Sequence, residues 1–98
     1  MTCPVFFMPK ARAEVIDAED WYESKAKGLG DEFRLEVARA AERIAEAPLH
    51  FPQVARELRR ARILRFPYAL YFRLMPDGIY VVACFHSMRN TRPLTGRS

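Results

Sequence analysis

The sequence predicts an α+β domain in which a helical hairpin packs on one face of an antiparallel sheet. Apolar residues repeat at helical spacing in the first half of the chain, whereas in the second half they alternate or form short runs. A glycine pair separates the two helical patterns. A chain of 98 residues has room for only one modest core, so we expect a single domain over residues 1–98.

The first two expected elements are a short strand and a helix. Residues 5–8 are mostly β-branched or aromatic and precede Pro9, which favours a strand at the edge of a sheet. From Ala11 onward the spacing predicts a helix that ends at Gly28, because glycine readily adopts the left-handed conformation that closes many helices. The apolar face of this helix is expected to carry Val15, Ala18, Tyr22 and Ala26.

A second helix is expected after Gly28-Leu29-Gly30, with Asp31 favourably placed near its positive N-terminus. It should end before Pro48, since the residue preceding a proline is disfavoured in the helical conformation. The pattern predicts that the two helices form an antiparallel hairpin. The apolar stripe of the second helix consists of Phe33, Val37, Ala40, Ala41 and Ile44.

Three strands are expected in the second half. Residues 60–66 alternate in polarity and predict a strand whose register the sequence leaves open. Residues 68–75 form a stronger, aromatic strand, and the Pro-Asp-Gly at 76–78 predicts a tight turn. Residues 79–85 are the most apolar run, as expected for a central strand. Residues 87–98 predict an irregular basic tail.

Charge is unevenly divided along a chain whose net charge is +4. Residues 1–48 carry seven Lys or Arg and ten Asp or Glu, whereas residues 49–98 carry nine Arg, no Lys and two acidic residues. Arginine pairs bidentately with carboxylate and phosphate groups. The second half is therefore expected to bind an acidic protein or a nucleic acid, and the alternative is an ordinary solvated surface.

No stretch reaches the roughly 18 apolar residues that a membrane-spanning helix requires, and the apolar start lacks the basic region of a signal peptide. We therefore expect a cytoplasmic protein. Cys3 and Cys84 lack the paired spacing of a zinc site or a disulfide framework, so free thiols are expected. We also expect no metal and no cofactor, because no glycine-rich phosphate loop or ligand cluster is visible.

Five segments, in the right order along the chain, resemble the RelE/ParE superfamily of toxins. They are PKARAEV (9–15), WYE (21–23), GLGDEF (28–33), RFPYALYF (65–72) and HSMRN (86–90). The last two are similar to the RFPY strand and the H-x-x-R ending of that family. The resemblance implies a β-α-α-β-β-β fold and a plasmid-stabilisation type of toxin. An antitoxin, whose C-terminal segment wraps the helices and the sheet, would hold this toxin inactive.

Members of this superfamily differ in their target. ParE-like toxins poison DNA gyrase, and RelE-like toxins cleave mRNA in the ribosomal A site, typically with lysines, arginines and a C-terminal tyrosine. The second half here has no lysine, and no tyrosine follows Tyr80. These departures favour a ParE-like inhibitor of gyrase that acts by protein–protein contact and is not an enzyme.

Two alternatives stay open. One is a RelE-like ribosome-dependent endoribonuclease, in which Arg65 and Arg73 would clamp phosphate and His86 would act as the base. The structural alternative for His86 is a strand-end residue bonded to the backbone. The other functional alternative is a repurposed family member that binds its partner but is not toxic.

Binding residues were assigned from charge and aromatic content. The candidates for antitoxin contact are Trp21, Tyr22, Arg59, Arg60 and Arg62. The resemblance to the C-terminal region of ParE-like toxins implies target contact by Arg89, Arg92 and Arg97. Trp21, Tyr22 and Phe33 are expected to leave apolar surface exposed on the helix pair. Cys84 and His86 share a strand face, but Cys84 is expected to be a buried apolar residue and not a nucleophile.

Overall fold

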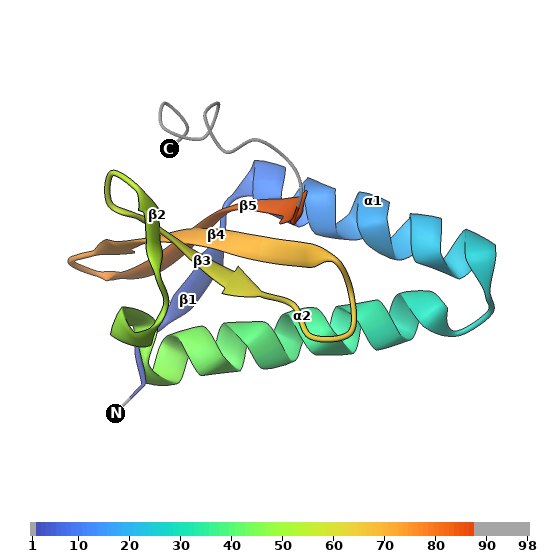
Figure 1. Cartoon of the computed structure of the whole chain (residues 1–98), viewed down its shortest axis with the longest axis horizontal. Helices are drawn as coiled ribbons and strands as arrows, with labels where there is room; N and C mark the ends of the chain where they lie inside the picture. The colour runs from blue at the N-terminus through green and yellow to red at the C-terminus, as the bar shows by residue number, and fades with distance from the viewer. Residues whose placement is uncertain (1, 88–98) are drawn as a thin grey trace.

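Two antiparallel helices lie against one face of a five-stranded sheet (Figure 1). The computed structural model describes residues 2–87. Its elements are β1 (Val5–Phe7), α1 (Pro9–Lys25), α2 (Leu29–Glu46), the 3-10 helix η1 (Pro48–His50), β2 (Gln53–Ala55), β3 (Leu58–Arg62), β4 (Tyr68–Met75) and β5 (Gly78–His86). This confirms the expected α+β class and the order of strand, helical hairpin and strands.

The sheet is mixed, with the strand order β1-β5-β4-β3-β2. All neighbours are antiparallel except β1, which runs parallel to β5 with Val5 opposite Ile79. The prediction of a wholly antiparallel sheet was therefore wrong at this edge. A tight hairpin forces two strands to be antiparallel, but β1 and β5 are joined through the whole intervening chain, so no local signal fixes their direction.

The strand predicted over residues 60–66 was also misplaced. The alternation over residues 60–66 predicted a strand, whereas β3 ends at Arg62 and residues 63–67 form the connection to β4. Arg65 has a φ of +72°, in the left-handed region, which breaks an extended strand at that point. The short β2, which pairs with β3 at the other edge, was not predicted. In contrast, β4 has the predicted bounds.

The turn between the helices is held by a side chain. Gly28 has a φ of +87°, and its N–H donates to the carboxylate of Glu23 at 3.0 Å. The N–H of Gly30 donates to the same carboxylate at 2.9 Å. A Cβ at Gly30 would lie 2.8 Å from the carbonyl oxygen of Glu19, so only glycine allows α1 and α2 to approach this closely. Glu23 thus satisfies two N–H groups at the start of α2.

The two hydrogen bonds lower the pKa of Glu23 from its ordinary value of 4.5. A carboxylate whose pKa is lowered in the folded state stabilises the fold at pH values above its ordinary pKa of 4.5. This contribution disappears as the pH falls through the folded-state pKa. We expect Glu23→Ala to lower the melting temperature at neutral pH and the difference from wild type to shrink in acid. Thermal unfolding at both pH values measures this, with exposed Asp20→Ala as the control. An equal difference at both pH values would contradict the assignment.

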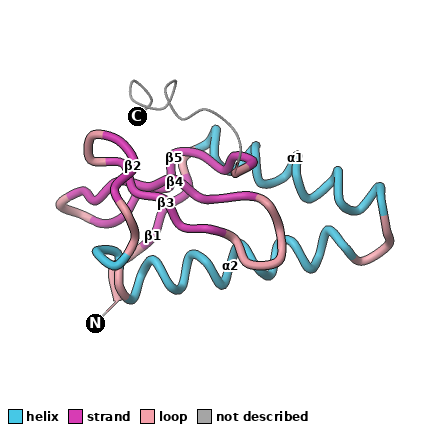
Figure 2. The backbone as a smooth tube through the Cα atoms, in the orientation of Figure 1, coloured by secondary structure: helices cyan, strands magenta, loops and turns pink. Residues whose placement is uncertain are grey.

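Figure 2 shows the helix pair beside the sheet, and buried side chains from both layers form the main core. Phe33 is fully buried there and packs on the rings of Tyr22, Phe66 and Tyr68, with centroid separations of 5.2, 5.2 and 5.3 Å. The prediction that Tyr22 and Phe33 expose apolar surface was wrong, because both lie on the buried stripes of their helices. The large apolar side chains exposed on α1 and α2 are Ile16, Trp21 and Leu35.

A second apolar cluster occupies the sheet face that carries no helix. Its buried members are Leu58, Ala69, Tyr71, Val82, Ala83 and Phe85. We refer to this side as the helix-free face. Neither α1 nor α2, nor any other helix in the described part of the chain, is long and apolar enough to cross a membrane.

Candidate functional site

Arg59, Arg60 and Arg62, which are close in the sequence, lie on opposite faces of the sheet because they alternate along strand β3. The register with β4 pairs Arg59 with Phe72, Arg60 with Tyr71 and Arg62 with Ala69. Cross-strand partners lie on the same face of a sheet. Since Phe72 belongs to the core beneath the helices, Arg59 lies on the helix side, while Arg60 and Arg62 lie on the helix-free face with Tyr71.

The environments of these arginines differ as well. The guanidinium of Arg59 is partly buried and donates to the carbonyl oxygen of Phe51 at 2.7 Å, which fixes the loop before β2. Arg62 is exposed and Arg60 is partly exposed. Arg73 lies two residues beyond Tyr71 on β4 and therefore on the same face, with its guanidinium 4.0 Å from the carboxylate of Glu57.

We call Arg60, Arg62 and Arg73 the arginine face. These three side chains line the helix-free side of β3 and β4, next to the apolar cluster that contains Tyr71. The apolar cluster itself is buried, so the guanidinium groups are what this surface offers to a partner, and they fit an acidic protein segment. Sequence reasoning missed the contribution of Arg73 to this surface, although strand alternation from Tyr71 would have revealed it.

The helix pair offers a second surface. The side chain of Trp21 is 54% exposed, and its ring meets Tyr22 edge-on at 5.1 Å. Tyr22 itself is only 9% exposed and supports Trp21 from the core. Of the two aromatic residues predicted to contact an antitoxin, only Trp21 presents most of its side chain at the surface.

A groove of about 440 Å³ runs between α1 and α2, and we call it the interhelix groove. Its apolar lining includes Phe7, Val15, Ile16 and Val37. Ile16, at its edge, is 48% exposed. The sequence analysis missed Ile16 because it lies off the buried stripe of its helix, and an apolar residue outside that stripe is the signal that would have found it.

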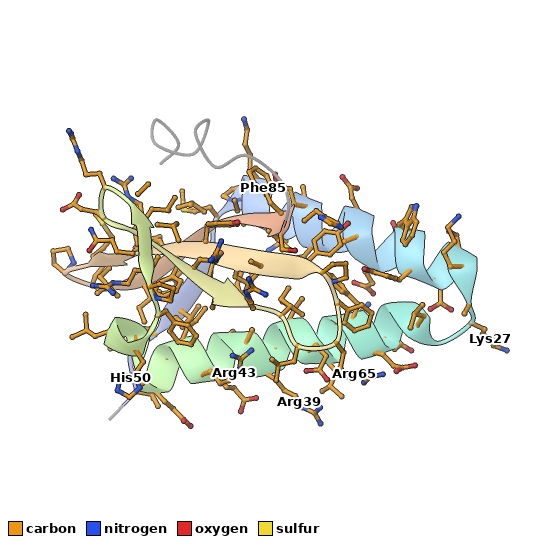
Figure 3. All side chains as sticks on the ribbon, in the orientation of Figure 1. Lys27, Arg39, Arg43, His50, Arg65 and Phe85 are labelled. Atoms are coloured by element: carbon orange, nitrogen blue, oxygen red, sulfur yellow. The ribbon has the colours of Figure 1, made fainter. Side chains whose placement is uncertain are left out.

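The three residues considered for RNA cleavage are not brought together. Arg65 lies in the β3–β4 connection beside α2 (Figure 3), where it binds Glu32 and lies 3.6 Å from the buried carboxylate of Glu36. The hydrogen bond and the charge of Glu32 raise the pKa of Arg65. These ion pairs engage Arg65 with α2 on the helix side of the sheet.

Arg73 on β4 and His86 on β5 lie far apart along the paired strands. His86 is opposite Tyr68 in the sheet, with ring centroids 5.5 Å apart, at the end of β5. Arg73 is five residues beyond Tyr68 on β4, which corresponds to roughly 16 Å along the strand. Arg73 also lies on the helix-free face, whereas Tyr68 packs against the core beneath the helices. No single phosphate can contact both side chains in this arrangement.

Cys84 is a buried residue, as the sequence predicted. It is 2% exposed, and its backbone N–H donates to Glu14 Oε1 at 3.0 Å. Burial, and then the charge of Glu14, raises the pKa of the Cys84 thiol to about 12. A thiol in this environment is protonated and is a poor nucleophile. Within residues 2–87, no group of His, Cys, Asp and Glu side chains is placed to hold a metal ion.

The two thiols should therefore react at very different rates. Cys3 is exposed, whereas Cys84 is buried and its raised pKa keeps its thiol protonated at neutral pH. We expect Ellman's reagent to modify one thiol rapidly and the second only after denaturation. In a Cys3→Ser variant, rapid modification should disappear. Two rapid equivalents in the folded protein would contradict the buried position of Cys84.

The proposed target-contact arginines, Arg89, Arg92 and Arg97, lie outside the described residues. The same holds for residues 88–90 of the H-x-x-R resemblance. The described part of the chain ends at Ser87, whose N–H donates to the carbonyl oxygen of Pro67 at 2.8 Å.

No protein-family model and no curated protein matches the sequence. Among solved structures, a chain of the "Chromosomal ParDE TA system from P. aeruginosa" is similar, with a TM-score of 0.63. The match covers 87% of this chain and 96% of that chain. The chain has a ParE-like fold. The two chains share only 15% sequence identity, so what they have in common is the arrangement of the helical hairpin and the sheet.

Proposed function

We propose that this chain is the toxin of a type II toxin–antitoxin pair and that a partner protein holds it inactive. The observation that carries the proposal is the ParE-like fold, shared over 87% of the chain with a chain of a ParDE TA system. Two surfaces support it: the interhelix groove, which is lined partly by apolar side chains, and the arginine face. Exposed apolar grooves are typical of surfaces that bind another protein.

The antitoxin would cover both surfaces. An apolar segment fits the interhelix groove, where Phe7, Val15 and Ile16 offer apolar contacts. An acidic segment fits the arginine face, because charge-assisted hydrogen bonds to guanidinium groups add steering and specificity. Trp21 would contribute at the exposed end of α1. Covering these surfaces would block access of the toxin to its target.

We further propose that the target is DNA gyrase and that inhibition occurs by protein–protein contact. The separation of Arg65, Arg73 and His86 supports this target over RNA cleavage, since acid–base catalysis needs its groups within hydrogen-bonding reach of one phosphodiester. A repurposed, non-toxic member of the family would keep both surfaces and lack this inhibition.

A supercoiling reaction tests the target. Purified chain added to gyrase, ATP and relaxed plasmid should block supercoiling and accumulate cleaved DNA. The variant His86→Ala should still inhibit supercoiling, because inhibition by protein–protein contact requires no proton transfer by His86. Intact supercoiling together with cleavage of ribosome-bound mRNA, lost in His86→Ala, would assign the chain to the ribonuclease alternative. If the chain neither blocks supercoiling nor cleaves mRNA, the result would favour a repurposed, non-toxic member of the family.

A further inference from the structure

A separate groove lies between α1 and the adjoining ends of β4 and β5. Its volume is about 570 Å³, within the range of roughly 300–1,000 Å³ typical of ligand sites. Side chains from both layers line it, among them Glu14, Asp17, Trp21, Tyr68 and His86. Since the interhelix groove uses other residues of α1, the two grooves open on different faces of that helix. We call this one the acidic aromatic groove.

The charge of this groove is opposite to that of the chain. The protein carries 16 Lys and Arg against 12 Asp and Glu. Among the ten residues that line the groove, however, none is Lys or Arg, and Glu14 and Asp17 are carboxylates. The groove therefore favours a cation, unlike the arginine face on the helix-free side of the sheet.

The walls of the groove are aromatic. The centroid of the Tyr22 ring lies 6.0 Å from that of Tyr68 and 5.1 Å from that of Trp21. The centroids of the His86 and Tyr68 rings are 5.5 Å apart. The Lys25 ammonium lies 4.9 Å from the centre of the Trp21 ring, which is a cation–π contact at the edge of this groove. Aromatic faces next to carboxylates form a setting that binds cationic groups by both charge and ring quadrupole.

We propose that the acidic aromatic groove binds an arginine side chain of a partner protein. A guanidinium group is planar, so it stacks on aromatic rings and donates paired hydrogen bonds to a carboxylate at the same time. A lysine ammonium offers charge without the stacking plane and fits the same walls less well. The proposal does not depend on toxicity, because a repurposed member of the family would keep the groove.

Fluorescence of Trp21, which is the only tryptophan of the chain, reports on the groove directly. The probes are capped Gly-Arg-Gly, Gly-Lys-Gly and Gly-Gln-Gly peptides, titrated into the full chain. We expect a saturable change with the arginine peptide, a weaker one with the lysine peptide and none with the glutamine peptide. Asp17→Asn should weaken arginine binding about tenfold, because it removes one charge-assisted hydrogen bond.

The matched control is Asp20→Asn, which removes an exposed carboxylate of α1 outside the groove and should leave binding unchanged. Circular dichroism establishes that each variant is folded. An equal response to the glutamine peptide, or unchanged binding by Asp17→Asn, would overturn the proposal. Binding that appears only after Arg89, Arg92 and Arg97 are replaced by Gln would assign the groove to the chain's own C-terminus and overturn the partner assignment.

Discussion

Phe33→Ala is expected to lower the free energy of unfolding by about 3–5 kcal/mol. Phe33 is fully buried and is surrounded by the rings of Tyr22, Phe66 and Tyr68, which come from α1, the β3–β4 connection and β4. Removing its ring leaves a cavity that these neighbours cannot fill without moving separate elements. Since native proteins have a total stability of only about 5–15 kcal/mol, this loss removes a large fraction of the free energy of unfolding.

Urea denaturation followed by circular dichroism measures this effect. The matched control is Leu35→Ala, also on α2, where the side chain is 50% exposed and the expected change is within about 0.5 kcal/mol. A loss of stability at Leu35 as large as that at Phe33 would mean that the helices do not pack on the sheet as described.

Replacing both Arg60 and Arg62 with Ala is expected to weaken antitoxin binding about 100-fold at low salt. The estimate assumes two charge-assisted hydrogen bonds of about 1.5 kcal/mol each, and a tenfold change corresponds to about 1.4 kcal/mol. The affinity of the double variant should also depend less on salt, because the screened interaction has been removed.

Arg59→Ala distinguishes this surface from a general loss of positive charge. Arg59 lies on the helix side, where its guanidinium supports the carbonyl of Phe51. Its removal should lower stability and leave the salt dependence of binding unchanged. Titration with the cognate antitoxin over a range of salt concentrations measures the affinity of the wild type, the double variant and Arg59→Ala. Wild-type affinity of the double variant at low salt would show that the antitoxin does not use the arginine face.

Periodicity was sufficient to predict the helical hairpin and the strongest strands. The stripe from Phe33 to Ile44 predicted the buried face of α2, and the aromatic run of residues 68–75 predicted β4 with its observed bounds. Periodicity failed at residues 63–67, where the alternation continues although Arg65 adopts a left-handed conformation. Arg65 forms ion pairs with Glu32 and Glu36, which lie more than 25 residues before it in the sequence, so no local pattern indicates these contacts.

The candidate surfaces were only partly predictable. Trp21 lies next to the stripe formed by Val15, Ala18 and Tyr22 but not on it, and this position is what leaves Trp21 exposed. The sequence grouped Arg59 with Arg60 and Arg62 because the strand register was unknown, and a shift by one residue moves a side chain to the opposite face. The acidic aromatic groove joins residues 14–22 to residues 67–86, which only the tertiary fold brings together.

Induced expression of the chain in a bacterial host, alone and together with its proposed antitoxin, distinguishes a toxin from a harmless protein of the same fold. We expect growth arrest with filamentation and DNA-damage signalling when the chain is expressed alone, and normal growth when both proteins are expressed. Normal growth of cells that contain the chain alone, in folded and soluble form, would contradict the proposal that it is a toxin.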